Sequence, residues 1–329
     1  MVTLSVIIPT YRREAPLRRC LADVLGQCHP AFEVLIVDQS PDHEPETRAA
    51  LRALPSHARH VRLAEPSVTA AVNAGVALAA GSLLLFLDDD IEIDDRELLA
   101  RHARHYDDPG VGGVVGRIVN AERRGDLPRP EADGPLGFLQ MNFDHPYPMD
   151  VPTAAGANMS FRRALIEQLG GFDERYTANA FRWETDFSLR AIRAGYRIRY
   201  DPEARVLHHY GTPGGCDNGH LLGRTGASHA WYEPFFRNNT YFALKLLGGG
   251  DRARFLWRLY REHVLNRAFA TAGPTFLARR HAALARGAAS GWRTWREARE
   301  EPGVEGRHGS AGAARATGGP GAMSGPPVK

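Results

Sequence analysis

The sequence contains few cysteines and no long apolar run. Three of its 329 residues are cysteine, an odd number without the spacing of a metal-binding or redox motif. This count argues against a disulfide framework and favours a reducing compartment. Because no stretch of roughly 18 apolar residues occurs, we expect no membrane span. The first residues enter an apolar strand pattern without a charged leader, so we expect no signal peptide and a cytoplasmic location.

The chain as a whole has no strong charge of one sign, but one segment does. The formal net charge is +3, and 43% hydrophobic with 24% charged residues is typical of a soluble globular protein. Between Arg252 and Arg299, eleven arginines stand against two acids. With tryptophans among the arginines, this segment either forms a solvated helical cover or lies on an anionic membrane surface, at the inner face of the membrane. No recognition helix or aromatic stacking platform accompanies the charge, so nucleic acid is not an expected partner.

Five consecutive apolar residues, Leu83 to Leu87, lead directly into Asp88, Asp89 and Asp90. An unbroken apolar run without a helical period is typical of a strand buried on both faces of a parallel sheet, and ligands bind at the carboxyl ends of such strands. Clustered carboxylates repel one another and are costly to desolvate, so a divalent cation is their expected partner. Asp88 and Asp90 point the same way on an extended segment, and their oxygens suit Mg²⁺ or Mn²⁺. The alternative is an aspartate-rich turn that caps the next helix.

Strand and helix patterns alternate through the first part of the chain. The expected strands are 4–8, 32–37, 61–63 and 83–87, and the expected helices are 14–27, 46–54, 69–79 and one that begins at Asp94 or Asp95. This alternation predicts an α/β fold, with a mostly parallel sheet and helices on both faces. Right-handed crossovers would bring the residues that follow these strands to one edge of the sheet. We expect the functional site at that edge.

The second part of the chain begins with a strand pattern at 111–119 and a proline-rich excursion from 122 to 152, which is expected to be functional. Extended segments follow at 154–161, 197–200 and 204–207, and helices are expected at 162–169 and from 182 to about 195. The small residues near Gly156 allow a backbone or a ligand to approach closely.

The helix that begins near Trp183 carries Glu184 and Asp186 in its first turn, where the helix dipole favours anions. Residues two apart on a helix do not face the same point, so one carboxylate is expected to line the site and the other to pair with Arg190 or with backbone N–H groups. The alternative is a capped helix with an ordinary surface ion pair. Trp183 offers a flat surface on which a sugar ring can sit. His208 ends a strand, either as a core or surface histidine or as a third metal ligand.

Four stretches in this order resemble family 2 of the glycosyltransferases, which has the nucleotide-binding GT-A fold. They are Ser5 to Tyr11, Val34 to Asp38, Asn73-Ala74-Gly75 with Phe86 to Asp90, and Gly170 to Asp173 with Trp183 to Asp186. The resemblance covers about residues 2–245. We therefore expect a GT-A catalytic domain over 1–245, a helical basic extension over 246–300 and a disordered tail over 301–329, which is rich in glycine and proline.

The resemblance implies which residues hold the nucleotide. Pro9, Thr10 and Tyr11 look like the loop that packs against the base and ribose. Asp38 looks like the carboxylate that accepts the N3–H of uracil or thymine, which favours a UDP or dTDP sugar. Asn73 belongs to the same expected nucleotide site.

The resemblance also implies a metal site and a base. Residues 88–90 are similar to the DxD motif, in which Asp90 would hold the metal, Asp88 would touch ribose or metal, and Asp89 would belong to the nucleotide site. His208 matches the late histidine of the family. Glu184 stands where the family has its catalytic aspartate, and Asp186 is the alternative base. Gly156 and Asn158 fall where the family approaches the donor sugar and the acceptor, and Trp183 stays the expected surface for the sugar ring.

The implied reaction is a metal-dependent, inverting transfer of a sugar to an acceptor hydroxyl of a glycan, lipid-linked or small-molecule acceptor. A carboxylate serves as general base, and a single displacement follows because no second nucleophilic carboxylate is expected near the donor. Two other functions fit part of the pattern. A sugar nucleotidyltransferase would need a glycine-rich loop after the first strand, where this chain has Tyr11-Arg12-Arg13. A nucleotide-sugar-binding scaffold would release no free nucleotide when an acceptor is supplied.

Overall fold

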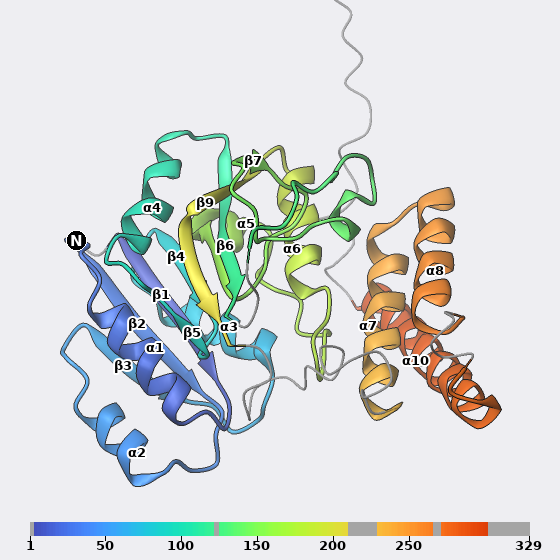
Figure 1. The fold of residues 1–329 in the computed structure, drawn as a ribbon, viewed down its shortest axis with the longest axis horizontal. Coiled ribbons are helices and arrows are strands. Elements are labelled where there is room, and N and C mark those ends of the chain that lie inside the picture. Colours follow the sequence, from blue (N-terminus) through green and yellow to red (C-terminus); the bar gives the residue numbers. More distant parts are fainter. Residues whose placement is uncertain (1–2, 122–124, 210–228, 266–270, 302–329) are drawn as a thin grey trace, which may run out of the picture.

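The computed structural model describes residues 3–121, 125–209, 229–265 and 271–301 (Figure 1). Within these residues one mixed sheet of nine strands runs in the order β3-β2-β1-β4-β8-β6-β9-β5, and β7 pairs with β9. The predicted α/β architecture is confirmed, with parallel pairing in the first half of the sheet and mixed pairing in the second. The predicted disordered tail lies outside the described residues from 302 onward.

The first half of the sheet is parallel, and helices connect its strands. The strands are β1 (Leu4–Thr10), β2 (Phe32–Asp38), β3 (Ala58–Arg62) and β4 (Leu83–Leu87), and the helices are α1 (Ala15–Leu25), α2 (Pro45–Arg52) and α3 (Val68–Leu78). In β4, Leu84 and Phe86 pack into the hydrophobic core on one face of the sheet, whereas Leu85 and Leu87 pack into the core on the other. The apolar run is therefore buried on both faces, as predicted.

The second half of the sheet mixes strand directions. Its strands are β5 (Ile91–Glu92), β6 (Val111–Asn120), β7 (Met149–Asp150), β8 (Asn158–Arg162) and β9 (Arg197–His208). Strand β8 lies antiparallel between β4 and β6, and β9 runs parallel to β6. This arrangement brings the end of β9 to the same edge as the end of β4. The short helices η1 (His105–Asp107), η2 (Gly137–Leu139) and α5 (Arg163–Gln168) and the longer α6 (Trp183–Arg193) complete this part.

Three of the differences from the predicted element boundaries have a local structural cause. Helix α3 begins one residue before Thr69, because Ser67 caps it with its side-chain oxygen. Helix α4 (Leu98–Arg104) begins later than Asp94 or Asp95. Strand β5 precedes it in the chain, and the Asp95 side chain accepts a hydrogen bond from the Glu97 N–H, which lies before the first residue of the helix. The two short strands expected at 197–207 are one strand, since β9 stays paired with β6 across an irregularity after Gly116.

Within the described residues, three helices follow the sheet and lie on the side of it where α6 is found (Figure 1). They are α7 (His229–Leu246), α8 (Gly249–His263) and α10 (Pro274–Glu300). Helices α7 and α10 approach closely at Gly287 and Gly291, where a Cβ atom would clash with backbone carbonyl oxygens of α7. Among the described helices, none has the length and apolar character needed to cross a membrane.

Candidate active site

A cavity of about 820 Å³ lies at the carboxyl ends of β1 and β4 and extends to the start of α6. The loop after β4 and the first turn of α6 both contribute to its wall, although about one hundred residues separate them in the sequence. The predicted site residues that line it are Pro9, Thr10, Tyr11, Asp88, Asp89, Asp90, Gly156, Trp183, Glu184 and His208. The structure therefore brings most of the predicted residues to one cavity.

Asp88, Asp90 and His208 form a cluster in which one possible ligand atom of each lies within 4.8 Å of the others. The His208 Nε2 atom lies 3.1 Å from Asp88 Oδ2 and 3.3 Å from Asp90 Oδ1. Two carboxylate oxygens and an imidazole nitrogen form a donor set that suits Mn²⁺ or Mg²⁺, with water and phosphate completing the shell. The residues present therefore fit the predicted cation.

His208 is also held as a cation by the same two aspartates. Although burial alone lowers the pKa of His208, its hydrogen bonds to Asp88 and Asp90 raise it to about 9. Because an imidazole must be neutral to bind a metal, a cation at this cluster competes with the His208 proton.

Arg13, which also lines the cavity, forms ion pairs with the two buried aspartates, a role that the sequence did not reveal. Its Nη2 atom lies 3.0 Å from Asp90 Oδ2, and its Nε atom lies 3.3 Å from Asp89 Oδ1. Thr10 donates a hydrogen bond of 2.6 Å to the other oxygen of Asp89. Burial raises the pKa of Asp89 to about 7, although the positive charge of Arg13 lowers it. Asp89 thus ties the end of β1 to the end of β4, and the predicted nucleotide contact stays a prediction.

Glu184 reaches the cavity from the first turn of α6. Its Oε1 atom accepts a hydrogen bond of 3.3 Å from the Gly156 N–H. Burial raises the pKa of Glu184 to about 7, and the negative charge of Asp88 adds to the shift. A carboxylate with a pKa near neutrality is suited to accept a proton at physiological pH. Gly156 has to be glycine here, because a Cβ atom would lie 2.9 Å from the indole of Trp183.

Asp186 points away from the cavity, so the alternative base is not placed at the site. It is fully buried, and Arg190 Nε lies 2.8 Å from its Oδ1 atom. Its Oδ2 atom lies 2.6 Å from Lys245 Nζ and accepts a hydrogen bond of 3.0 Å from the Tyr176 hydroxyl. The expectation that one acid lines the site and the other pairs with Arg190 is confirmed.

Besides Asp186, three predicted site residues do not line the cavity: Asp38, Asn73 and Asn158. Asp38 is fully buried, and His43, His60 and the Ser40 N–H all hydrogen-bond to its carboxylate. Although burial alone would raise the pKa of Asp38, these hydrogen bonds hold it well below its usual range. The predicted contact with a base is therefore corrected: the carboxylate stabilises the end of β2, and its neighbour Gln39 lines the cavity.

Asn73 and Asn158 are corrected in the same way. The Asn73 amide donates to the Phe172 carbonyl and accepts from the Phe172 N–H, which ties α3 to the loop after α5. Asn158 is fully buried in β8, where it contacts His102 of α4 at 2.8 Å and the Ala204 carbonyl at 2.8 Å. Both amides use their hydrogen-bonding groups within the protein. Trp183 lines the cavity, but only 6% of it is exposed, because it packs against Phe172.

The family model described as Glycosyl transferase family 2 matches residues 5–170. Among curated proteins, the O-antigen biosynthesis protein RfbC of Myxococcus xanthus is 30% identical over 222 residues, 63% of this chain and 17% of that protein. The pre-mycofactocin glycosyltransferase of Mycobacterium tuberculosis is 30% identical over 217 residues, 64% of this chain and 43% of that protein. The chain thus spans less than half the length of both relatives.

Two solved structures share the fold. S. aureus TarS 1–349 in complex with UDP-GlcNAc has a TM-score of 0.58 and 17% identity, with 91% of each chain covered. The mannosyltransferase PcManGT from Pyrobaculum calidifontis, in complex with GDP-Man and Mn²⁺, has a TM-score of 0.52 and 21% identity, with 92% of this chain and 82% of that chain covered. These similarities confirm the predicted GT-A fold.

Proposed function

The chain belongs to glycosyl transferase family 2, and we propose that it moves a sugar from a nucleoside diphosphate sugar to an acceptor hydroxyl in one inverting displacement. The observation that carries the proposal is the shared cavity of Glu184 and the cluster of Asp88, Asp90 and His208. A base and a set of metal ligands that face the same space are what such a transfer needs. We propose Mg²⁺ or Mn²⁺ as the cation of the cluster.

In the proposed reaction the acceptor oxygen forms a bond to the anomeric carbon while the bond between that carbon and the diphosphate oxygen breaks. Glu184 accepts the proton of the acceptor hydroxyl, and the nucleoside diphosphate leaves with the bonding electron pair. A cation held by Asp88, Asp90 and His208 would supply Lewis-acid stabilisation of the negative charge on the diphosphate. The positive charge of Arg13 keeps both buried aspartates in place when the donor arrives.

The donor is proposed to be UDP- or dTDP-linked, which rests on the family resemblance. Residues at the end of β1 and in the segment from Pro66 to Val68 line the cavity, which supports the proposal that they contact the nucleoside. Because Asp38 is committed to its protein partners, we propose that base recognition uses groups that do line the cavity, such as the Gln39 side chain or backbone. The acceptor is proposed to enter along the wall formed by the 122–152 excursion, from which Leu127 and residues 142–144 line the cavity.

The decisive experiment has two steps. First, thermal unfolding is followed with UDP, dTDP and GDP, with and without Mn²⁺, because a ligand that binds the folded state raises its apparent stability. We expect a metal-dependent rise with UDP or dTDP. Second, release of free nucleoside diphosphate from the matching sugar donor is measured with an acceptor mixture. Loss of this release in both Asp90→Ala and Glu184→Gln is expected; release that survives in both would contradict the proposal.

The basic segment from 252 to 299 has two proposed roles, a solvated cover and a peripheral membrane contact. Trp257 is 58% exposed and Trp292 is 45% exposed, and Arg296 lies over the Trp292 ring. Exposed tryptophans among arginines favour the membrane contact. Sedimentation with vesicles of phosphatidylglycerol and phosphatidylcholine decides between the roles. Binding that Trp257→Ala and Trp292→Ala weaken supports membrane contact, and absence of binding supports the solvated cover.

A further inference from the structure

Helix α7 contacts α6 at both ends and in the middle. The N-terminal boundary residue of α6, Arg182, has a positive φ of 83° and makes no side-chain capping hydrogen bond within the described residues. Such a backbone conformation is unusual for a residue with a side chain, so the start of α6 has to be held by other contacts. The contacts from α6 to α7 are Arg182 to Asn239 at 3.1 Å, Asp186 to Lys245 at 2.6 Å, and Arg193 to the Leu246 carbonyl.

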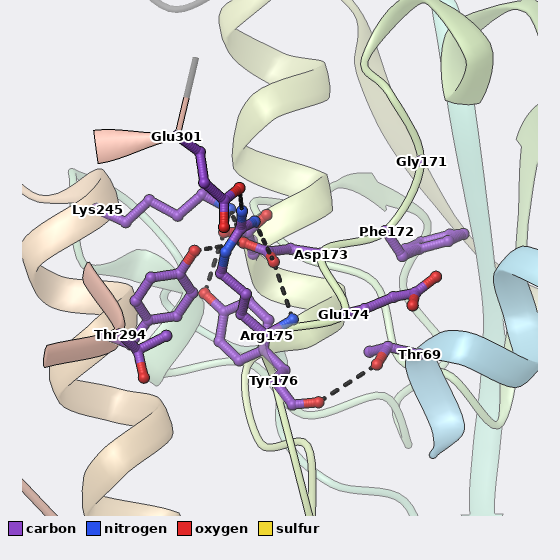
Figure 2. Close-up of polar contacts among 12 residues, drawn as sticks. Thr69, Gly171, Phe172, Asp173, Glu174, Arg175, Tyr176, Lys245, Thr294 and Glu301 are labelled. Atoms are coloured by element: carbon purple, nitrogen blue, oxygen red, sulfur yellow. Dashed lines mark hydrogen bonds and ion pairs between the residues drawn. The ribbon is translucent and has the colours of Figure 1, made fainter. Parts of the chain in front are cut away.

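Lys245 is the central contact of this set. Its ammonium group lies 2.6 Å from an oxygen of Asp186 and 2.6 Å from an oxygen of Asp173, in the loop before α6 (Figure 2). Both carboxylates are buried, and Lys245 itself is largely covered. Two buried carboxylates this close repel each other unless a cation stands between them. Lys245 therefore neutralises a pair of acids, one of which lies in the same helical turn as Glu184.

Other groups complete the network but do not replace Lys245. The Tyr241 hydroxyl donates to the same oxygen of Asp173 at 2.6 Å, and Arg175 pairs with the other oxygen of Asp173 and with Glu301. Figure 2 shows Asp173, Arg175, Lys245 and Glu301 converging beside α7. The shared oxygens of Asp173 and Asp186 both face the ammonium group, so its loss leaves the two charges facing each other.

We propose that Lys245 is a positioning residue for Glu184: by joining Asp173 to Asp186 it fixes the first turn of α6, and so the place of the base in the cavity. The inference rests on the proposed function of Glu184. Glu184 and Asp186 are two residues apart on one rigid turn, so a shift of Asp186 moves Glu184 with it. A displacement of about 1 Å at a reacting group is enough to lower a rate by about 100-fold.

The test compares Lys245→Met with the double variant Lys245→Met/Asp173→Asn. In the single variant we expect kcat to fall at least tenfold with little change in the KM for the donor. We also expect amide hydrogen exchange to become faster in residues 182–193. In the double variant one of the facing charges is gone, so kcat is expected to return to within about threefold of the wild type and exchange to slow again. The magnitudes follow from the steep dependence of rate on placement.

Arg286→Met is the matched control. It removes the exposed ion pair between Arg286 of α10 and Glu233 of α7, and both kcat and exchange in α6 are expected to stay at the wild-type level. The proposal is overturned if Lys245→Met matches the wild type, or if the double variant is as impaired as the single variant. If Lys245→Met does not fold, the double variant decides alone by the same criterion.

The measurement of amide hydrogen exchange does not depend on catalytic activity. If the wild-type protein released no nucleoside diphosphate from any donor, the proposed function would fail, while faster exchange of α6 in Lys245→Met would still support the positioning contact.

Discussion

Replacement of Glu184 by glutamine tests the proposed base directly. The substitution keeps the size of the side chain and an oxygen that can accept a hydrogen bond from the Gly156 N–H. It removes the ability of the side chain to take up a proton. A positioned general base typically contributes about 10² to 10⁴ in rate. This corresponds to about 2.7 to 5.4 kcal/mol of transition-state stabilisation. We therefore expect kcat to fall by that factor while the KM for the donor changes little.

Glu184→Gln is expected to lower kcat but to raise the stability of the folded protein at alkaline pH. Because burial raises the pKa of Glu184 from 4.5 to about 7, the folded protein binds this proton more tightly than the unfolded chain. The stability of the wild type therefore decreases as the pH rises from about 4.5 to about 7, by up to about 3 kcal/mol. Glutamine has no such proton, so Glu184→Gln is expected to unfold at a higher temperature than the wild type at pH 8.

The pH dependence of the rate provides the assay. With the free wild-type protein, kcat/KM is expected to increase tenfold per pH unit below about 7 and to level off above it, because only the ionised carboxylate accepts a proton. Release of nucleoside diphosphate is followed in a coupled assay from pH 5.5 to 8.5 at constant ionic strength, since these conditions bracket the pKa. A Glu184→Gln rate within tenfold of the wild type, or a wild-type profile without a break near neutrality, would refute the assignment.

The remaining predictions concern the groups around Glu184. Asp186→Asn leaves Arg190 without its carboxylate and Lys245 with Asp173 alone, and it is expected to lower the free energy of unfolding by about 3 to 5 kcal/mol, measured by urea denaturation. Removal of divalent cations with EDTA is expected to abolish transfer, and Mn²⁺ affinity measured by calorimetry should increase about tenfold per pH unit below pH 9, because the metal displaces the proton of His208. Affinity that stays constant between pH 6 and 8 would exclude His208 as a ligand. Gly156→Ala is expected to push Trp183 and Glu184 away, and to cost about 1 to 3 kcal/mol of stability together with a lower kcat; a fully active variant would contradict the tight contact.

The sequence was sufficient to predict the elements of the sheet whose residues face cores on both sides. The run from Leu83 to Leu87 has no polar position, and this property follows from burial on both faces. The residues directly after that run were also predictable, because the carboxyl ends of parallel strands share an edge. His208 was placed correctly by its position at a strand end. The division into a catalytic domain and an extension stays a prediction.

Side-chain direction was harder to predict than position along the chain. Asn158 lies near the cavity, but its amide points to His102 and Ala204, which are 56 and 46 residues away in the sequence. Local spacing carries no information about such partners. The contacts of Arg13 with Asp89 and Asp90, and the contact of His60 with Asp38, also join residues that are far apart in the sequence. Family resemblance located the region of the site, whereas packing between distant elements decided which polar atoms face the cavity.

In the first turn of α6, two acids of similar chemistry have different roles: Asp186 is structural, and Glu184 is the proposed base. Glu184 and Asp186 start from similar intrinsic acidity. Asp186 lies between Lys245 and Arg190, which pair with its two oxygens and hold it in place. Glu184 has one backbone N–H as its hydrogen-bond donor outside its own residue, and burial raises its pKa to about 7. Ion pairs hold a carboxylate in place, whereas removal of a carboxylate from water raises its affinity for a proton. The cations that anchor Asp186 therefore give the turn its rigidity, whereas burial makes the Glu184 carboxylate basic enough to accept a proton, against the opposing charge of Arg182.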